Sequence, residues 1–550
     1  METIKTTVMG ERRDTPRGSS LLEISKDYQR MFKRPIILAK VDNELQELGN
    51  AVTRPCDIEF LDISDPNGFR IYQRSAVFLM LYAAKAVLGE KTRVVVEHSI
   101  NKNYYCSIPD EDIDITEELL ESIELKMRDT VDGNTPIEKF SISVEYAMEL
   151  AKRFNLQDKA DYMLYRRTSN VNFYRLDWFW DYFYAPMAPS AGYITQFKLR
   201  PKNSGFLLLF PSPSNLDAIG EIALVDKVFQ IFRESNKWAR ILEVGNVGSL
   251  NNAICDNKLD NLILVSEALH EKKTANIADN ICADSKKVVF IAGPSSSGKT
   301  TFAQRLCVQL RVNGFKPSMI SLDNYFLGPA EAPLDEFGKP NFESVDAIDV
   351  ETINAHLKAL IAGERVEMPT FNFLTGSREY KGKFLQLGEN DILVIEGIHA
   401  LNSRVNGQID DKDKFKIFIS ALTQLNMDDH NYISTTDTRL IRRIVRDSRR
   451  RGFDSRTTLS VWPSVVRGET QFIFPYQKEA DVFFNSALIY EMCILKHYAE
   501  PHLFQINRSW PEYTEARRLV KFLDSFLSVD SHQVPTNSIL REFIGGSCFE

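Results

Sequence analysis

Residues 287–306, KVVFIAGPSSSGKTTFAQRL, decide the fold class of this chain. They hold a β-branched apolar run, a turn of glycine and serine, and an amphipathic stretch, which together predict strand, loop and helix. Residues 293–300 fit the pattern G-x-x-x-x-G-K-[ST] of a phosphate-binding loop. In such a loop, small residues let backbone N–H groups surround phosphate oxygens at a helix N-terminus. The alternative is a chance turn between a strand and a helix.

The residues of this loop have separate expected roles. Lys299 would reach the β- and γ-phosphates of a triphosphate, and the Thr300 hydroxyl would bind Mg²⁺. The loop alone does not separate a kinase from a GTPase or a motor ATPase. The residues predicted to bind the nucleotide are Gly293, Ser295, Ser296, Ser297, Gly298, Lys299, Thr300 and Thr301.

Two later apolar runs each end in an acid. Residues 317–326, PSMISLDNYF, predict a strand ending at Asp323, whose carboxylate would lie at the carboxyl edge of the sheet beside the phosphate loop. There it could accept a proton from a substrate hydroxyl or bind Mg²⁺ through water. The alternative is an aspartate that only caps a turn. Residues 391–397, DILVIEG, predict another strand ending in Glu396, where a Walker B acid is expected near the metal.

Residues 437–452, DTRLIRRIVRDSRRRG, predict a basic helix. One face carries four arginines at i, i+3 and i+4 spacing, namely Arg439, Arg443, Arg446 and Arg450. A run of like charge is often only a solvated helix face. Beside a phosphate loop, however, such a helix can be a mobile lid that brings guanidinium groups to the transferring phosphate and excludes water. We therefore expect a lid.

Taken together, these motifs resemble the uridine–cytidine kinase and phosphoribulokinase group. GPSSSGKTT, SLDNYF, NFESVDAID, PTFNFLTGSR, VIEGIHAL and DTRLIRRIVRDSRRRG occur in the order seen in that group and cover about residues 286–500. The resemblance implies a P-loop nucleoside kinase that transfers the γ-phosphate of ATP to the 5′-hydroxyl of a nucleoside. It implies ATP and Mg²⁺ as cofactors, and an oligomeric state by analogy only.

The resemblance also implies a role for each matching residue. Asp323 matches the general base, Glu343 stands where an aspartate usually holds the ribose hydroxyls, and Glu396 matches the Walker B acid. The predicted catalytic residues are Asp323, Lys299, Arg443, Arg446 and Arg451. The predicted substrate-binding residues are Asp323, Phe326, Glu343, Phe371 and Arg378, and the predicted metal ligands are Thr300 and Glu396.

The loop expected to read the base departs from the pattern of the group. Its Tyr-Asp-Phe…His-Ser-Arg is replaced here by Phe371-Asn372-Phe373…Gly376-Ser377-Arg378. Phe453 and Val461 also stand where polar residues would help to read the base. An apolar pocket discriminates by only ~1–3 kcal/mol per group. A different base, relaxed specificity or another hydroxylated metabolite is therefore left open.

The N-terminal half resembles the front end of threonyl-tRNA synthetase. AKVDNELQEL resembles its TGS domain, and VVVEHSINKNYYC with DYFYAPMAPSAGYI resembles its second additional, editing-type domain. The positions of the HxxxH and CxxxH motifs of that domain are taken here by Arg74, Phe78, Phe183 and Met187. Neither Arg nor Phe can replace a neutral imidazole ligand, so we expect no deacylation. No synthetase core follows.

Four regions are expected along the chain of 550 residues. From residue 287 onward, strands alternate with helices, which indicates a parallel sheet and an α/β fold. The two regions at the N-terminus have α+β character. The predicted regions are a TGS-like domain (1–65), a degenerate editing-like domain (66–214), a helical connector (215–285) and a P-loop kinase domain with C-terminal helices (286–550).

Composition bounds the partners and the compartment. The formal net charge of −8 argues against a broad DNA-binding surface. Seven cysteines without a CxxC pair fit a reducing compartment, and the absence of a long apolar run predicts no membrane span, so we expect a cytoplasmic protein. The rival hypothesis is a nucleotide-dependent RNA-binding or regulatory protein that uses the N-terminal half.

Overall fold

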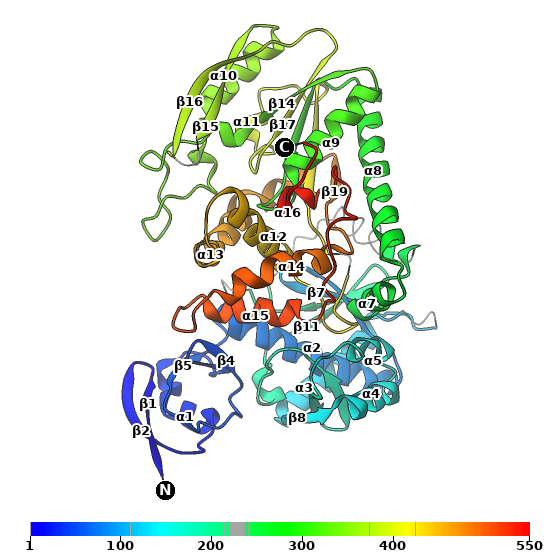
Figure 1. Cartoon of the computed structure of the whole chain (residues 1–550). Helices are drawn as coiled ribbons and strands as arrows, with labels where there is room; N and C mark the ends of the chain where they lie inside the picture. The colour runs from blue at the N-terminus through cyan, green and yellow to red at the C-terminus, as the bar shows by residue number, and fades with distance from the viewer. Residues whose placement is uncertain are drawn as a thin grey trace.

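The computed structural model describes residues 2–109, 112–212, 215–220, 237–239, 241–372, 375–423 and 425–549. In Figure 1 the N-terminal regions lie at the bottom and the parallel sheet of the C-terminal region lies at the top. Between them run α14 (Glu491–Phe504) and α15 (Tyr513–Leu523). Among the described residues, no helix has the length and apolarity needed to cross a bilayer.

The first region is a five-stranded sheet with one helix, α1 (Leu21–Tyr28). Ser20 caps this helix in a capping box with Glu23, which explains where the helix begins. The sheet order is β2–β1–β5–β3–β4. The strands are β1 (Thr3–Val8), β2 (Glu11–Pro16), β3 (Leu38–Val41), β4 (Glu44–Gln46) and β5 (Asp57–Leu61).

The second region contains two antiparallel sheets and a long buried helix, α2 (Pro66–Leu88). Asp65 caps α2 and Pro66 occupies its first turn, where a missing N–H costs nothing. One sheet has the order β11–β12–β7–β6, from Lys198–Lys202, Gly205–Leu209, Asn103–Ser107 and Val95–Ile100. The other has the order β10–β9–β8, from Phe179–Tyr182, Asn170–Leu176 and Ile137–Ser143. Its shorter helices are α3 (Glu117–Asp132), α4 (Val144–Arg153) and α5 (Gln157–Met163).

Two helices lead from the second region to the parallel sheet, α7 (Val247–Cys255) and α8 (Leu259–Ala283). Residues 221–236, which belong to the same predicted connector, lie outside the described residues. In Figure 1, α8 runs upward beside α9 (Lys299–Val312), the helix that follows the phosphate loop. Arg305 of α9 pairs with Glu267 at 3.4 Å and Glu271 at 2.7 Å, both in α8. The connecting helix therefore supports the phosphate loop from behind.

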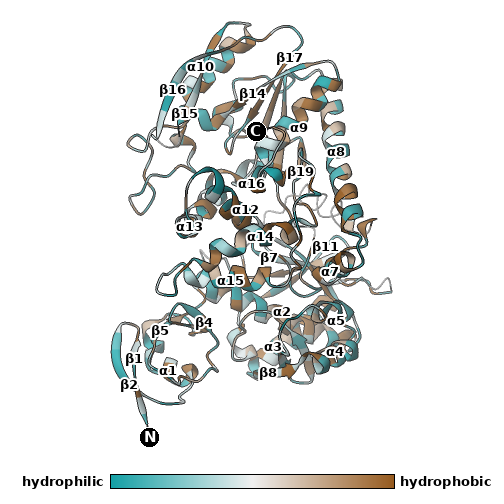
Figure 2. Ribbon diagram, in the orientation of Figure 1, coloured by the Kyte–Doolittle hydropathy of each residue, from teal (hydrophilic) through white to brown (hydrophobic). Residues whose placement is uncertain are grey.

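The C-terminal region is built on a parallel sheet, which confirms the predicted α/β class. Its order is β14–β17–β13–β18–β19, and all neighbours are parallel. The strands are β13 (Val288–Ala292), β14 (Lys316–Ser321), β17 (Asp391–Glu396), β18 (Lys414–Ser420) and β19 (Val482–Asn485). Because β13 is central, the loop that follows it lies between the ends of the neighbouring strands. Figure 2 shows apolar colouring within this sheet, and every residue of β13 is buried.

The remaining elements surround this sheet. A two-stranded ribbon, β15 (Val366–Asn372) with β16 (Ser377–Leu385), stands beside it. The helices are α10 (Val350–Ile361), α11 (Ser403–Asn406), α12 (Thr435–Arg450), α13 (Ser455–Phe472) and α16 (Arg541–Ile544), besides those already named.

The two halves of the chain are joined through buried charges. Lys159 is fully buried and bonds Asp181 at 2.6 Å and Asp428 at 3.3 Å. His430 Nδ1 lies 2.7 Å from Asp181. We call these four residues the buried charge cluster. Asp428 and His430 come from the segment between β18 and α12, so the C-terminal region reaches into the N-terminal half.

Candidate active site

The phosphate loop has the strand, loop and helix that the sequence predicts. It leaves β13, and Gly298 caps α9 with φ +82°, a conformation that favours glycine. A Cβ on Gly293 would lie 2.2 Å from the Ile419 carbonyl oxygen of β18. Both glycines are therefore required by the backbone geometry. The Ser296 and Ser297 hydroxyls are buried without a hydrogen-bond partner among the described residues, so they can accept or donate to a phosphate.

Side chains from the neighbouring helices hold the loop in shape. The Ser295 N–H donates to Glu469 of α13 at 3.0 Å. Arg439 of α12 donates to both Glu469 oxygens at 2.5 and 2.7 Å and to the Ser295 carbonyl at 3.1 Å. Arg442 donates to the Ser296 carbonyl at 3.4 Å and to Ser486. Arg439 and Arg442 are buried, so these residues support the loop and are not part of a solvated helix face.

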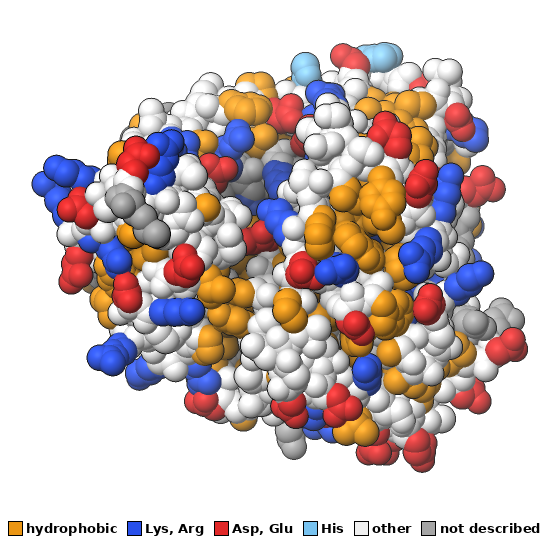
Figure 3. All heavy atoms as spheres, turned by 90° about the horizontal axis from the view of Figure 1, so that it is seen from below, with side chains coloured by type: hydrophobic (Ala, Val, Ile, Leu, Met, Phe, Trp, Pro, Cys, Tyr) orange, Lys and Arg blue, Asp and Glu red, His pale blue; other side chains and the backbone are white. Residues whose placement is uncertain are grey.

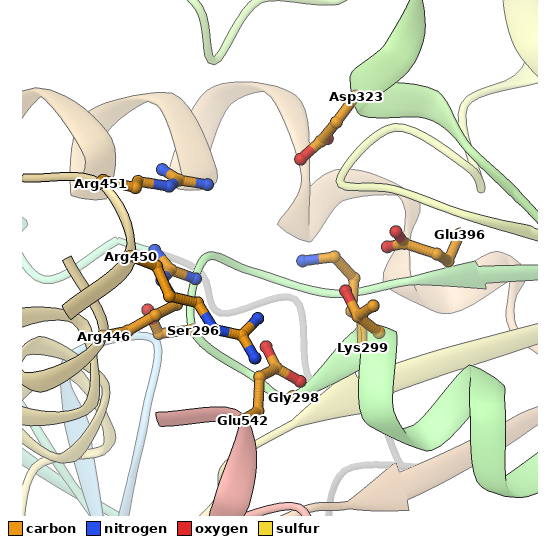
Figure 4. A pocket seen from close by; sticks show the side chains of 10 residues that line it. Ser296, Gly298, Lys299, Asp323, Glu396, Arg446, Arg450, Arg451 and Glu542 are labelled. Atoms are coloured by element: carbon orange, nitrogen blue, oxygen red, sulfur yellow. The ribbon is translucent and has the colours of Figure 1, made fainter. Parts of the chain in front are cut away.

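A cavity of about 150 Å³ opens at the loop. Figure 4 shows Lys299 and Asp323 pointing into one space, with Arg451 facing them from the other side. The residues that line the cavity are Ser296, Gly298, Lys299, Thr300, Asp323, Glu396, Arg446, Arg450, Arg451 and Glu542. The motifs that the sequence predicted to converge therefore meet around one space.

Asp323 reaches this cavity from a turn. The predicted strand over 317–326 is too long, because β14 ends at Ser321, which pairs with the last residue of β17, Glu396. Beyond that pair, β17 offers no further partner, and the chain turns into a 3-10 helix over Leu322–Tyr325. The turn carries the Asp323 side chain over the carboxyl edge of the sheet.

Glu396 is a buried acid of the site. Burial, and then the charge of Asp323, raise its pKa to about 7, while Lys299 acts in the opposite direction. A divalent cation would displace the proton, because metal binding favours the ionised ligand. The Thr300 hydroxyl and the Glu396 and Asp323 carboxylates line the same cavity, and such hard oxygen donors suit Mg²⁺.

The arginines at the C-terminal end of α12 are organised by one buried acid, Asp447. It accepts from Arg443 at 3.1 Å and from Arg446 at 3.0 Å, and Arg451 lies 3.9 Å away. Arg443 also donates to the Ser295 hydroxyl at 3.1 Å. Burial and then the charge of Arg446 lower the pKa of Arg451 to about 10. This concentration of positive charge faces the phosphate loop.

Of the residues predicted at the substrate, Asp323 lines the cavity, whereas Phe326, Glu343, Phe371 and Arg378 do not. Phe326 packs against Phe342 and Phe371, with ring centroids 6.0 Å apart in each pair. Arg378 is paired with Asp349, the N-cap of α10, at 2.8 Å. Phe373 lies outside the described residues.

Glu343 is the buried acid on this side. Its Oε2 atom has no hydrogen-bond partner among the described residues. Burial, and then the charge of Glu469, raise its pKa to about 7, and the charges of Lys299, Asp323 and Arg443 also act on it. Glu343 therefore lies close to the cavity and has a carboxylate oxygen available for a hydrogen bond with a ligand.

Four residues that shape the site were not predicted from the sequence, namely Asn324, Asp447, Glu469 and Glu542. Asn324 accepts from the Phe371 N–H at 3.1 Å and so fixes β15 beside the turn of Asp323. Asp447 lies four residues after Arg443, a helical spacing that could have revealed it. Glu469 and Glu542 belong to no motif and reach the loop only through the fold.

The degenerate positions of the N-terminal half do come together. Phe78 of α2 packs edge-on against Phe183, with ring centroids 5.4 Å apart. Arg74 donates to the Pro186 carbonyl at 2.7 Å, and Met187 is buried. In the described part of the chain, no group of three or more His, Cys, Asp or Glu residues is arranged to hold a metal ion.

The fold and the cavity define a P-loop kinase. A family model described as "Phosphoribulokinase / Uridine kinase family" matches residues 288–489. The chain is 30% identical over 194 residues to a uridine kinase of Halobacterium salinarum, which covers 35% of this chain and 76% of that protein. It is also 30% identical over 196 residues to a uridine kinase of Macrococcus caseolyticus, covering 36% and 85%. The chain belongs to the phosphoribulokinase / uridine kinase family.

Two solved structures are also similar to part of the chain. One is described as a possible uridine kinase from Bacillus stearothermophilus. It is 18% identical, the match covers 39% of this chain and 98% of that chain, and the TM-score is 0.28. Another is a D-glycerate 3-kinase from Cryptococcus neoformans, with 14% identity, 48% and 87% coverage and a TM-score of 0.21. The family model does not extend to the N-terminal half, whose resemblance to threonyl-tRNA synthetase stays a prediction.

Proposed function

We propose that this protein transfers the γ-phosphate of ATP to the 5′-hydroxyl of a nucleoside. The observation that carries the proposal is the common cavity of Lys299, Thr300, Asp323 and Glu396, which the lid arginines face. A base at the carboxyl edge of the sheet, beside a phosphate loop, suits proton removal from an attacking hydroxyl. The named uridine kinases support the nucleoside as acceptor.

Each group would have a distinct task in this reaction. Asp323 accepts the proton of the substrate hydroxyl, and Lys299 stabilises the β- and γ-phosphate oxygens. Arg443, Arg446 and Arg451 stabilise charge on the transferred group and exclude water. Thr300 and Glu396 would hold Mg²⁺, which supplies positive charge to the phosphates when bound. Proximity and charge would carry most of the catalysis, because the loose transition state of phosphoryl transfer asks for little covalent chemistry.

The surroundings of Glu343 support a sugar-bearing substrate. Its buried Oε2 has no partner among the described residues, and a ribose hydroxyl would provide one. The rings of Phe326, Phe342 and Phe371 offer apolar contacts to a base in place of hydrogen bonds. This combination supports binding of a ribose with limited reading of the base.

Because the base-reading positions are apolar, a second acceptor class deserves the same test. A kinase of another small hydroxylated metabolite would use the same loop and the same Asp323. The test is a screen with radiolabelled ATP against ribonucleosides, deoxynucleosides and sugar phosphates. We expect labelled nucleoside 5′-monophosphates, with several bases accepted. Label transferred only to the sugar phosphates, giving labelled sugar bisphosphates, would favour the second class.

The wild type and Glu343→Gln should be compared in this screen. If Glu343 holds ribose hydroxyls, the variant raises KM for ribonucleosides and changes KM for ATP little. Glu351→Gln, on an exposed position of α10, is the matched control.

A filter-binding assay with tRNA at low salt tests the RNA-binding hypothesis, and no binding there leaves it without support.

A further inference from the structure

A carboxylate from the C-terminus of the chain already binds the phosphate loop. Glu542, in the short helix α16, accepts from the Thr301 backbone N–H at 3.1 Å and from the Thr301 hydroxyl at 2.9 Å. The Glu542 residue is only 8% exposed. It lines the same cavity as Lys299 and Thr300, and Figure 4 shows it beside Gly298.

The Thr301 donors are those that a nucleotide would need. Thr301 is the third residue of α9, and the first N–H groups of a helix have no carbonyl partner within the helix. At a phosphate loop these N–H groups, at the positive end of the helix dipole, bind phosphate oxygens. A carboxylate offers the same acceptor chemistry, so Glu542 occupies a phosphate position.

Glu542 also makes the cavity less favourable for a polyanion. Its carboxylate adds a third acidic side chain to the cavity that Asp323 and Glu396 also line. The cavity measures about 150 Å³, whereas sites for drug-sized ligands span roughly 300–1,000 Å³. A nucleoside triphosphate therefore needs more room, and less negative charge, than this arrangement offers.

The segment that carries Glu542 is firmly attached. Ile539 and Phe543 are fully buried, and a Cβ on Gly298 would lie 2.5 Å from Ile539 Cγ2. Arg449, near the end of α12, donates to the Phe543 carbonyl at 3.0 Å. Residues 529–549, which we call the C-terminal strap, thus contact both the phosphate loop and the helix of the lid arginines.

We propose that the C-terminal strap is a built-in competitor of the nucleotide. In the nucleotide-free protein the Glu542 carboxylate occupies the Thr301 donors, and it must leave them before nucleotide phosphates can bind there. The strap lies beyond residues 288–489, the part that matches the family model. The proposal rests on the proposed function only in requiring that the loop binds a nucleotide.

The test compares ATP binding by the wild type and Glu542→Gln, by calorimetry with and without Mg²⁺. Glutamine keeps the size of the side chain and removes its charge, so the blocked state becomes less populated. We expect the dissociation constant for ATP to fall about three- to tenfold, since apparent affinity scales with the competent fraction. The control is Asp530→Asn, the same charge change at a strap residue whose side chain is 73% exposed, which should leave the constant unchanged.

Four outcomes would overturn the proposal. Weaker binding by Glu542→Gln would show that Glu542 assists the nucleotide, and unchanged binding would show that it does not compete. If neither protein binds ATP, both this proposal and the proposed function fail. If both proteins bind ATP but Glu542→Gln binds it no more tightly than the wild type, only the competitor proposal fails. Amide hydrogen exchange of the wild type tests displacement of the strap without a substitution that changes folding. Residues 539–545 should exchange faster when ATP is added, and slower exchange would contradict displacement.

Discussion

The cavity at the phosphate loop and the buried charge cluster contain the same kinds of side chains in opposite arrangements. Around the cavity, Lys299, Asp323 and the arginines face a space of about 150 Å³. In the cluster, fully buried Lys159 faces its own acids, Asp181 and Asp428, at 2.6 and 3.3 Å. The first arrangement surrounds an open space, and in the second the charges pair with one another without exposure to solvent.

The pKa values follow this difference. Burial would raise the pKa of Asp181, but Lys159 and His430 lower it to about 2. Glu343 and Glu396, beside the cavity, both have their pKa raised to about 7 by burial first. Asp158 departs from the pattern, since burial and Asp429 raise its pKa to about 7 although it lies next to the cluster. The pKa of Asp181 is thus set by its buried cations, whereas burial dominates the pKa of Glu343 and of Glu396. Four substitutions test this difference between the two sites.

The largest effect is expected at Asp323. Asp323→Asn removes the base from the cavity and should lower kcat by about 10²–10⁴-fold, the usual contribution of a general base. Because the Asp323 side chain lines the cavity and is not packed in the hydrophobic core, the melting temperature should change little. Asp410→Asn, at an exposed position, is the control. Turnover close to that of the wild type would remove Asp323 from the mechanism.

A large loss of stability is expected at Lys159. Lys159→Met leaves Asp181 and Asp428 buried without their shared cation, which should lower the free energy of unfolding by about 3–5 kcal/mol. Urea denaturation measures the change. A loss below about 1 kcal/mol would mean that the cluster does not hold the two halves together.

A smaller effect with the opposite sign is expected at Glu343. The folded protein keeps the Glu343 proton up to about pH 7, whereas the unfolded chain loses it near 4.5. The free energy of unfolding therefore falls as pH rises between these values. Glu343→Gln should stabilise the protein at pH 8 by on the order of 1 kcal/mol, with a smaller gain at pH 5. Destabilisation at pH 8 would indicate a structural role for the carboxylate.

The smallest effect is expected at Lys258. It pairs with Asp256 at 3.2 Å, but the two side chains are 67% and 57% exposed. Lys258→Met should change the free energy of unfolding by less than about 0.5 kcal/mol, as is usual for surface ion pairs. The same substitution type at Lys159 and Lys258 then isolates the effect of burial. Equal losses at the two positions would contradict the comparison.

The sequence was sufficient for the elements that depend on local pattern. The apolar runs that became β13 and β17, the loop between β13 and α9, and the basic helix α12 were all predicted. Asp323 and Glu396 were placed at one edge of the sheet, because the carboxyl ends of parallel strands share an edge. The turn that carries Asp323 was not predicted, since it depends on where β17 ends.

Contacts between distant parts of the chain could not be predicted. Residues 428–431, DDHN, have the polar character of an exposed loop, yet they are buried. Their charges are matched by Lys159 and by Arg93, which bonds Asp429 at 2.6 Å, and no local pattern indicates those partners. The basic helix shows the same limit, because buried acids such as Glu469 pair with arginines that a solvated face would expose.

The insertion of residues 428–431 into the N-terminal half limits how the chain can be divided. The backbone carbonyl of Asp429 accepts from the Val96 N–H at 2.7 Å, and the backbone N–H of Asp429 donates to the Asp158 carboxylate at 2.7 Å. A strand, β6, and a helix, α5, of the N-terminal half therefore supply hydrogen-bond partners to this loop. A kinase region separated from the N-terminal half would therefore lose these two hydrogen bonds of Asp429. Any new neighbour would have to supply the cation, the acid and the strand edge that this loop uses.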